Sequence, residues 1–123
     1  MRSIKFRGKA RRDGKWFYGN LYVKDIYGRT HICMHERGCF DIDSETVSQF
    51  TGLYDCDGKE IYEGDILDFN GLKIEVRFVR GVFALLCNGD LDNELCGDCR
   101  TDMFAKVIGN IHDNPELLKG GEE

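Results

Sequence analysis

The sequence predicts a mainly β fold with little helix: an N-terminal β-hairpin or small sheet, followed by a small, bent barrel. Turn dipeptides such as Tyr27-Gly28, Asp57-Gly58 and Asn70-Gly71 recur at roughly the 8 to 12 residue spacing of short antiparallel strands. Residues 72–79, LKIEVRFV, alternate apolar and charged side chains with the period of two that a half-buried strand requires. A length of 123 residues, with 15 glycines and one proline, is typical of a single globular domain, 1–123.

The first part of this domain, 1–58, is predicted to be a β subdomain. Residues 4–10 and 15–23 should pair as a hairpin around the turn at 11–14. Residues 29–35, RTHICMH, are predicted to add a third strand. The N-terminal part is therefore expected to be one small sheet.

The end of this subdomain, 44–50, leaves two possibilities open. Ser44 has the character of a helix N-cap, which favours one short helix. Thr46 and Val47 are poor helix formers, which favours an edge strand. We expect one of these two structures.

The second part, 59–114, is predicted to be the small barrel. Residues 66–79 should form a hairpin, because Asn70-Gly71 suits a type I′ turn in which both central residues need positive φ. Further strands are expected at 82–87 and at 103–112, where Gly109 favours a strong bend in the closing strand. The frayed tail, 115–123, should begin with a brief helical turn at Pro115.

The stretch 51–67, TGLYDCDGKEIYEGDIL, is as rich in carboxylates as many active sites. Asp57-Gly58 is typical of a turn, Gly64 can adopt positive φ, and Asp65 can accept hydrogen bonds from nearby backbone amides. We interpret these carboxylates as structural. The rest of the sequence offers no paired carboxylates or oriented histidine for acid-base catalysis, so we expect no catalytic residues and no enzyme activity.

Three blocks of the sequence resemble the YopX family, which comprises small proteins of bacteriophages and prophages. They are KFRGKARRDGKWFYGNL at 5–21, TVSQFTGLYDCDGKEIYEGDIL at 46–67 and VIGNIHDNPELL at 107–118. The resemblance implies a phage or prophage origin, a β-rich fold whose C-terminal barrel is of the Src-homology-3 type, and no established activity. It carries no catalytic residues and no cofactor over to this chain.

Charge divides the sequence. From Met1 to Lys24, eight basic residues stand against Asp13 alone, a net charge of +7; from residue 25 onward nine basic and twenty-one acidic residues give −12, and the total is −5. Such asymmetry indicates a charged partner, another subunit or the protein's own acidic body. In the segment 1–24, the basic arm, basic residues surround the aromatic residues Phe6, Trp16, Phe17 and Tyr18, the mixture used by single-strand nucleic-acid binders. The residues of this hypothesis are Arg7, Lys9, Arg11, Arg12, Lys15 and Trp16. Alternatively, the aromatics are core and the basic residues coat the outer side of the hairpin.

The six cysteines are interpreted as thiols, because nothing in the sequence directs the chain to an oxidising compartment. Cys87, in VFALLC, is expected to be a core residue. Cys96 and Cys99 have the two-residue spacing of zinc ligands, and further ligands would have to come from the segment HICMHERGC. Those candidates are His31, Cys33, His35 and Cys39. We expect incidental thiols and no bound metal.

The sequence thus favours a non-catalytic binding or assembly protein that acts on a protein partner or on its own copies. Nucleic-acid binding through the basic aromatic hairpin is the alternative. The start, MRSIKFRGKA, contains no apolar run, so we expect neither a signal peptide nor a membrane partner. The expected location is the cytoplasm of a bacterial host cell.

Overall fold

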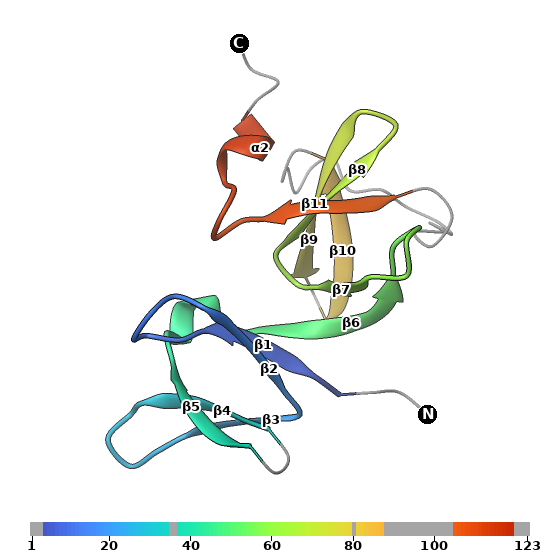
Figure 1. The fold of residues 1–123 in the computed structure, drawn as a ribbon. Helices are drawn as coiled ribbons and strands as arrows, with labels where there is room; N and C mark the ends of the chain where they lie inside the picture. The colour runs from blue at the N-terminus through green and yellow to red at the C-terminus, as the bar shows by residue number, and fades with distance from the viewer. Residues whose placement is uncertain (1–3, 35–36, 80, 88–104, 120–123) are drawn as a thin grey trace. The chain divides into compact units, whose positions relative to one another are not determined.

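The computed structural model describes residues 4–34, 37–79, 81–87 and 105–119 (Figure 1). These residues are mainly β, with several antiparallel sheets and two short helical segments, so the predicted fold class is confirmed. The chain divides into two compact units, 1–50 and 51–123. The predicted subdivision of a single domain at residue 58 stays a prediction.

The first unit contains two groups of antiparallel strands. One is the predicted N-terminal hairpin, in which β1 pairs with β2, and β1 also pairs with the first residues of β6. The other is a three-stranded sheet in the order β3-β4-β5. The elements are β1 (Phe6–Lys9), β2 (Trp16–Gly19), β3 (Leu21–Lys24), β4 (Thr30–Met34), β5 (Gly38–Ile42), the 3₁₀ turn η1 (Ser44–Thr46) and β6 (Ser48–Tyr54), which continues into the second unit.

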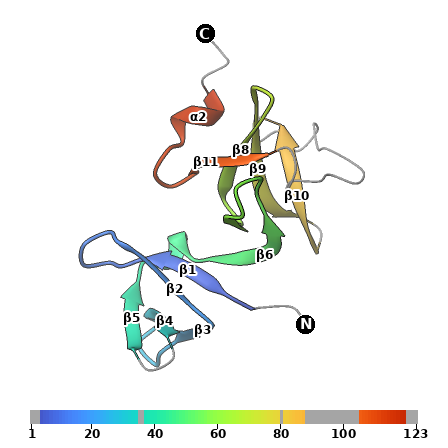
Figure 2. The ribbon, with the colours of Figure 1, turned by 45° about the vertical axis from the view of Figure 1, so that its right-hand side comes forward.

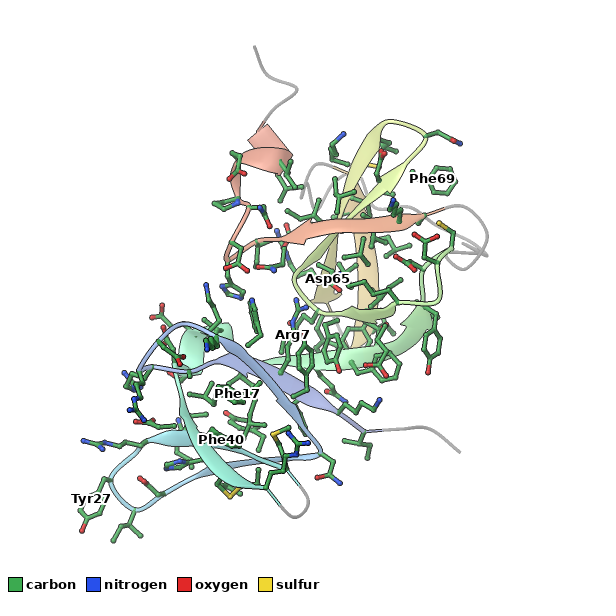
Figure 3. The ribbon with its side chains drawn as sticks, in the orientation of Figure 1. Arg7, Phe17, Tyr27, Phe40, Asp65 and Phe69 are labelled. Atoms are coloured by element: carbon green, nitrogen blue, oxygen red, sulfur yellow. A yellow bond between two sulfur atoms is a disulfide. The ribbon has the colours of Figure 1, made fainter. Side chains whose placement is uncertain are left out.

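The core of the first unit lies between the β1-β2 hairpin and the inner face of the β3-β4-β5 sheet. Ile32 and Ile42 are fully buried on that face, and Gly8 on β1 leaves room for both of them. Phe17 from β2 stacks on Phe40 from β5, with 4.4 Å between the ring centroids (Figure 3). These aliphatic and aromatic contacts hold the two layers together.

The prediction of one continuous strand over 15–23 is wrong. The chain bends at Asn20, so that β2 and β3 belong to different sheets. The cause lies at Gly19, where a Cβ atom would overlap the backbone carbonyl oxygen of Cys33. Glycine permits this close backbone approach, and the strand can therefore cross β4 and change sheets.

The segment 44–50 contains both of the structures left open by the sequence. Its start is the 3₁₀ turn η1, and its end is the beginning of β6. The N-cap is Asp43 rather than Ser44, because the Asp43 side chain accepts a hydrogen bond from the Glu45 amide at 3.2 Å. An N-cap at Ser44 is thus a prediction that the structure corrects by one residue.

The second unit is built on a curled four-stranded sheet in the order β10-β9-β8-β11 (Figure 2). The predicted Asn70-Gly71 turn is confirmed, with φ of 53° and 90°. The predicted bend in the closing strand is also confirmed, because the β11 register shifts between Val107 and Gly109. The elements are β7 (Glu60–Tyr62), which pairs with β6, and β8 (Asp65–Phe69), β9 (Leu72–Val79), β10 (Val82–Cys87), β11 (Lys106–Asn110) and α2 (Glu116–Lys119).

This curled sheet is a half-barrel, and its assignment to the Src-homology-3 type stays a prediction. One face carries the core cluster of the unit, and Phe69, Leu85 and Val107 pack against that cluster. The cluster consists of Ile61, Leu67, Ile74, Val76 and Ala105. Cys87 is buried as predicted.

The alternation along β9 is confirmed only in part. Ile74 and Val76 are buried, but Phe78, at the end of the same face, is 51% exposed. Glu75, expected on the solvent side, is buried. Arg77 holds it with two hydrogen bonds of 2.7 and 3.1 Å, so the buried charge is paired.

We predict that Gly19→Ala destabilises the protein by about 2–4 kcal/mol, since the new methyl group must displace the Cys33 carbonyl. Gly14→Ala is the control: its φ is 75° but nothing lies near the new methyl, so about 1 kcal/mol is expected. Urea unfolding followed by circular dichroism measures both values. Equal losses in the two variants would contradict the proposed cause of the strand break.

Candidate functional site

The β3-β4 hairpin ends in a turn, residues 25–29, that the side chain of Asp25 organises. Its Oδ1 atom accepts hydrogen bonds from the amides of Tyr27 and Arg29, both at 2.9 Å. Gly28, with φ of 81°, donates to the Asp25 carbonyl at 3.0 Å, and the Asp25 amide donates to the Arg29 carbonyl at 2.8 Å. Four hydrogen bonds therefore fix five consecutive residues.

The same turn occurs again in the second unit, at residues 55–59. The Oδ1 atom of Asp55 accepts from the amides of Asp57 and Lys59 at 2.9 and 2.8 Å. Gly58, with φ of 82°, donates to the Asp55 carbonyl at 3.0 Å, and the Asp55 amide donates to the Lys59 carbonyl at 2.9 Å. The shared pattern is Asp, two variable residues, Gly and a basic residue.

The second carboxylate oxygen distinguishes the two turns. In Asp55 it accepts from the backbone amide of Val107 at 3.0 Å, which joins the turn to β11. In Asp25 it accepts from the imidazole Nε2 of His31 at 3.0 Å. One turn is thus bound to backbone, and the other to a titratable side chain.

The variable residues differ as well. Ile26 and Tyr27, in the first turn, are 90% and 83% exposed. Figure 3 shows Tyr27 at the outer end of the β3-β4 hairpin, pointing away from the body of its unit. The same positions of the second turn hold Cys56 and Asp57, which are also exposed but small or polar. The turn at 25–29 therefore displays two large apolar side chains that the turn geometry does not require.

The charge around this turn is mainly positive. Lys24 and Arg29 are exposed on either side of the two apolar residues. The carboxylate of Asp25 is turned toward the hydrogen bonds that organise the turn. The hydrogen bond from His31, followed by that from the Arg29 amide, lowers the pKa of Asp25, so its carboxylate stays ionised at neutral pH.

Sequence reasoning recognised Tyr27-Gly28 only as a turn signal. Ile26 and Tyr27 were not among the predicted site residues. The signal that could have found them is the repetition of the pattern DxxG followed by a basic residue, as DIYGR at 25–29 and DCDGK at 55–59. The comparison of these two sequences reveals the apolar pair in the first.

The predicted nucleic-acid residues do not form one exposed row. Arg7 is 6% exposed, and its Nε donates to the Ser48 hydroxyl at 3.1 Å. Its guanidinium lies over the ring of Trp16, at 4.7 Å from the centroid, and the Lys9 ammonium lies 5.7 Å from it. Both cations are thus held against the aromatic ring on which a base would stack.

The remaining basic residues lie in and next to the β1-β2 turn. Arg11 Nε is 3.6 Å from an Asp41 carboxylate oxygen, which partly neutralises it. Arg12 and Lys15 are exposed. The structure thus brings Arg7, Lys9 and Trp16 together and leaves Arg12 and Lys15 at the surface. Nucleic-acid binding by the hairpin stays a prediction.

The interpretation of all six cysteines as thiols is wrong for two of them. Cys33 on β4 and Cys39 on β5 are direct partners in the sheet register, with 3.9 Å between their Cα atoms, and form a disulfide. Cys56 and Cys87 are free. Since Cys33 is bound to Cys39, neither sulfur is a free thiolate for zinc.

The predicted zinc candidates Cys96, Cys99 and His35 lie outside the described residues. Within the described ranges, no group of three or more His, Cys, Asp or Glu side chains could hold a metal ion. Within the same ranges, no helix is long and apolar enough to cross a membrane. The expectation that the chain binds no metal stays a prediction.

Fold and site together define a small, mainly β protein of two units, each with one turn of the pattern DxxG followed by a basic residue. The family model described as YopX protein matches residues 5–119, so the chain belongs to the YopX family. It is similar to a solved structure, that of protein EF1440 from Enterococcus faecalis, with 26% identity and a TM-score of 0.61. That match covers 96% of this chain and 99% of the other. No curated protein matches the chain.

The single tryptophan makes the nucleic-acid hypothesis directly testable. Because Arg7 and Lys9 already lie over Trp16, we expect its fluorescence to be unchanged when a single-stranded oligonucleotide is added at low salt. The control is an Arg12→Ala, Lys15→Ala double variant titrated in the same way. Quenching that saturates, weakens steeply with salt and is lost in the double variant would contradict this expectation.

We predict that Asp55→Asn destabilises the protein by about 1–3 kcal/mol at pH 7. The asparagine NH₂ group would replace the oxygen that accepts from the Val107 amide, which leaves two donors facing each other. Burial raises the pKa of Asp55, but the amides of Val107, Lys59 and Asp57 lower it further, and the net shift is downward. The stabilisation is therefore full above the unfolded-state pKa of about 3.9 and is lost as pH falls through the lower folded-state pKa.

Urea unfolding at several pH values tests this prediction. The difference between wild type and Asp55→Asn should shrink as the pH falls below about 4. Asp57→Asn is the matched control, since Asp57 is exposed and its carboxylate lies 3.9 Å from the Lys106 ammonium in a surface pair. A constant difference down to low pH would show that the charge of Asp55 is not the cause.

Proposed function

We propose that this YopX-family protein is a non-catalytic binding protein that attaches to a protein partner through residues 25–29, which we call the docking turn. The observation that carries the proposal is the exposure of Ile26 and Tyr27, 90% and 83%, on a turn fixed by four hydrogen bonds. Large exposed apolar groups on a rigid support are typical of interface anchors.

A purely structural explanation for Ile26 and Tyr27 is weakened by the second turn. Residues 55–59 have the same hydrogen bonds and the same positive φ at glycine, yet hold Cys56 and Asp57 at the equivalent positions. Apolar residues are therefore unnecessary for this turn. Burying one large apolar side chain gains about 1.5–3 kcal/mol, which is available at 25–29 only when a partner covers the turn.

The charges around the docking turn indicate the chemistry of the partner. Lys24 and Arg29 flank the apolar pair, so a fitting surface has an apolar pocket with carboxylates at its rim. Another copy of the chain is one such source, because the sequence from residue 25 onward carries a net charge of −12. A different acidic protein is the other.

The absence of catalysis belongs to the same proposal. Asp55 and Asp65 use their carboxylates to accept backbone amides, and Asp25 accepts two backbone amides besides the His31 imidazole, so we assign these carboxylates to the turns rather than to a carboxylate pair for acid-base chemistry. The resemblance to phage and prophage proteins supports a phage or prophage origin and action in the cytoplasm of a bacterial host. The protein would then act there by occupying a surface of its partner.

The docking turn can be tested by photocrosslinking in the native bacterial host. With p-benzoyl-phenylalanine in place of Tyr27, we expect one dominant protein adduct, identified by mass spectrometry, that disappears when Ile26→Ser is added. The matched control carries the same crosslinker in place of Asp57, in the equivalent turn, and should give no such adduct. Equal labelling from both positions would contradict the proposal, and an adduct made only of this chain would identify self-association.

A further inference from the structure

We propose that His31 is a positioning residue that makes the docking turn sensitive to pH, by holding the second carboxylate oxygen of Asp25. This inference rests on the proposed function for its consequence, the control of binding, but its physical part concerns the free protein alone. The observation behind it is a difference between two turns with the same internal hydrogen bonds: the partner of this oxygen is a backbone amide in the second turn and an imidazole in the first.

The two oxygens of Asp25 have separate roles. Oδ1 accepts from the Tyr27 and Arg29 amides and so fixes the loop that displays the apolar side chains. Oδ2 accepts from His31 Nε2 at 3.0 Å, across the end of the hairpin. His31 lies on β4 and is held in the sheet by β3 and β5, so it ties the carboxylate to the rigid part of the unit.

Two strands lie beside His31 in the sheet. Its partners in the sheet register are Val23 on β3, which is apolar, and Asp41 on β5. The Asp41 carboxylate already lies 3.6 Å from Arg11, so its charge is partly balanced. Asp25 is the acidic group within hydrogen-bond distance of the imidazole. The side chains of His31 and Asp25 are 24% and 33% exposed, so water and protons reach the pair.

The direction of the pH effect follows from the charges. Histidine changes its charge between about pH 5 and 8, and the protonated imidazolium makes a stronger, charge-assisted hydrogen bond to a carboxylate. The lowered pKa of Asp25 keeps its carboxylate ionised through this range. A neutral imidazole, the form that higher pH favours in any histidine, donates a weaker hydrogen bond to a carboxylate than an imidazolium does. The docking turn is therefore most tightly held at mildly acidic pH and loosens toward alkaline pH.

Amide exchange with solvent, measured by NMR and corrected for the intrinsic pH dependence of exchange, tests this in one sample. The protection of the Tyr27 and Arg29 amides should fall about threefold between about pH 5.5 and 8. The equivalent amides of Asp57 and Lys59 should keep their protection, because Val107 N–H does not titrate. A pH-independent ratio between the two turns would overturn the proposal.

Two substitutions separate positioning from general stability. His31→Gln keeps an N–H donor without a titrating group, and we expect its turn to be protected equally at both pH values. His31→Val, which suits a strand, should lower the protection of Tyr27 and Arg29 at both pH values. If the pH dependence persists in His31→Gln, another group is responsible and the proposal is wrong. If the crosslinker at position 27 gives no protein adduct while the pH response of the amides is present, the proposed function is refuted and this inference about the free protein is not.

Discussion

The interaction on which the rest of the structure depends is the aspartate carboxylate that accepts backbone N–H groups within a turn. It recurs in turns of both units, at Asp13, Asp25, Asp43, Asp55, Asp65 and Asp68. Short strands have few ladder hydrogen bonds of their own, so the register of each hairpin is set largely by its turn. The aspartates named here therefore serve first to fix turns.

This constraint also explains how far the sequence could predict the structure. Turn chemistry is local, so Asn70-Gly71, Gly64 with Asp65, the bend at Gly109 and the helical turn after Pro115 could be recognised from adjacent residues. The carboxylates of 51–67 were identified as structural on the same grounds, and Asp55 and Asp65 have that role.

The features that sequence reasoning missed depend on residues far apart in the chain. The strand break at Asn20 depends on the carbonyl of Cys33, which passes close to Gly19 only in the folded unit. The disulfide between Cys33 and Cys39 follows from their register across the β4-β5 hairpin. The expected strand covered only 29–35, so no strand was expected at Cys39. Composition cannot report such approaches, because it holds no information on which backbones meet.

The burial of two charged residues, Glu75 and Arg7 of the basic arm, also depends on residues far apart in the chain. A charged residue in an alternating strand is normally assigned to solvent, but Glu75 pairs in register with the fully buried Ile66 and Leu86, and Arg77 satisfies its charge. Arg7 likewise reads as an exposed cation in the sequence, yet Ser48 and Trp16 hold it in the interior.

Because charged residues serve the interior in this way, surface function is better sought where a side chain has no internal use. The two equivalent turns make that criterion concrete. In the turn at 55–59, the second carboxylate oxygen of Asp55 accepts from a backbone amide, and the exposed residues are small or polar. In the turn at 25–29, the same oxygen of Asp25 accepts from His31, and Ile26 and Tyr27 are exposed. Because the internal hydrogen bonds of the two turns are the same, the turn geometry alone does not explain the apolar residues of the first. On the function proposed for 25–29, the apolar pair serves contact with a partner, and the His31 hydrogen bond ties that turn to the sheet.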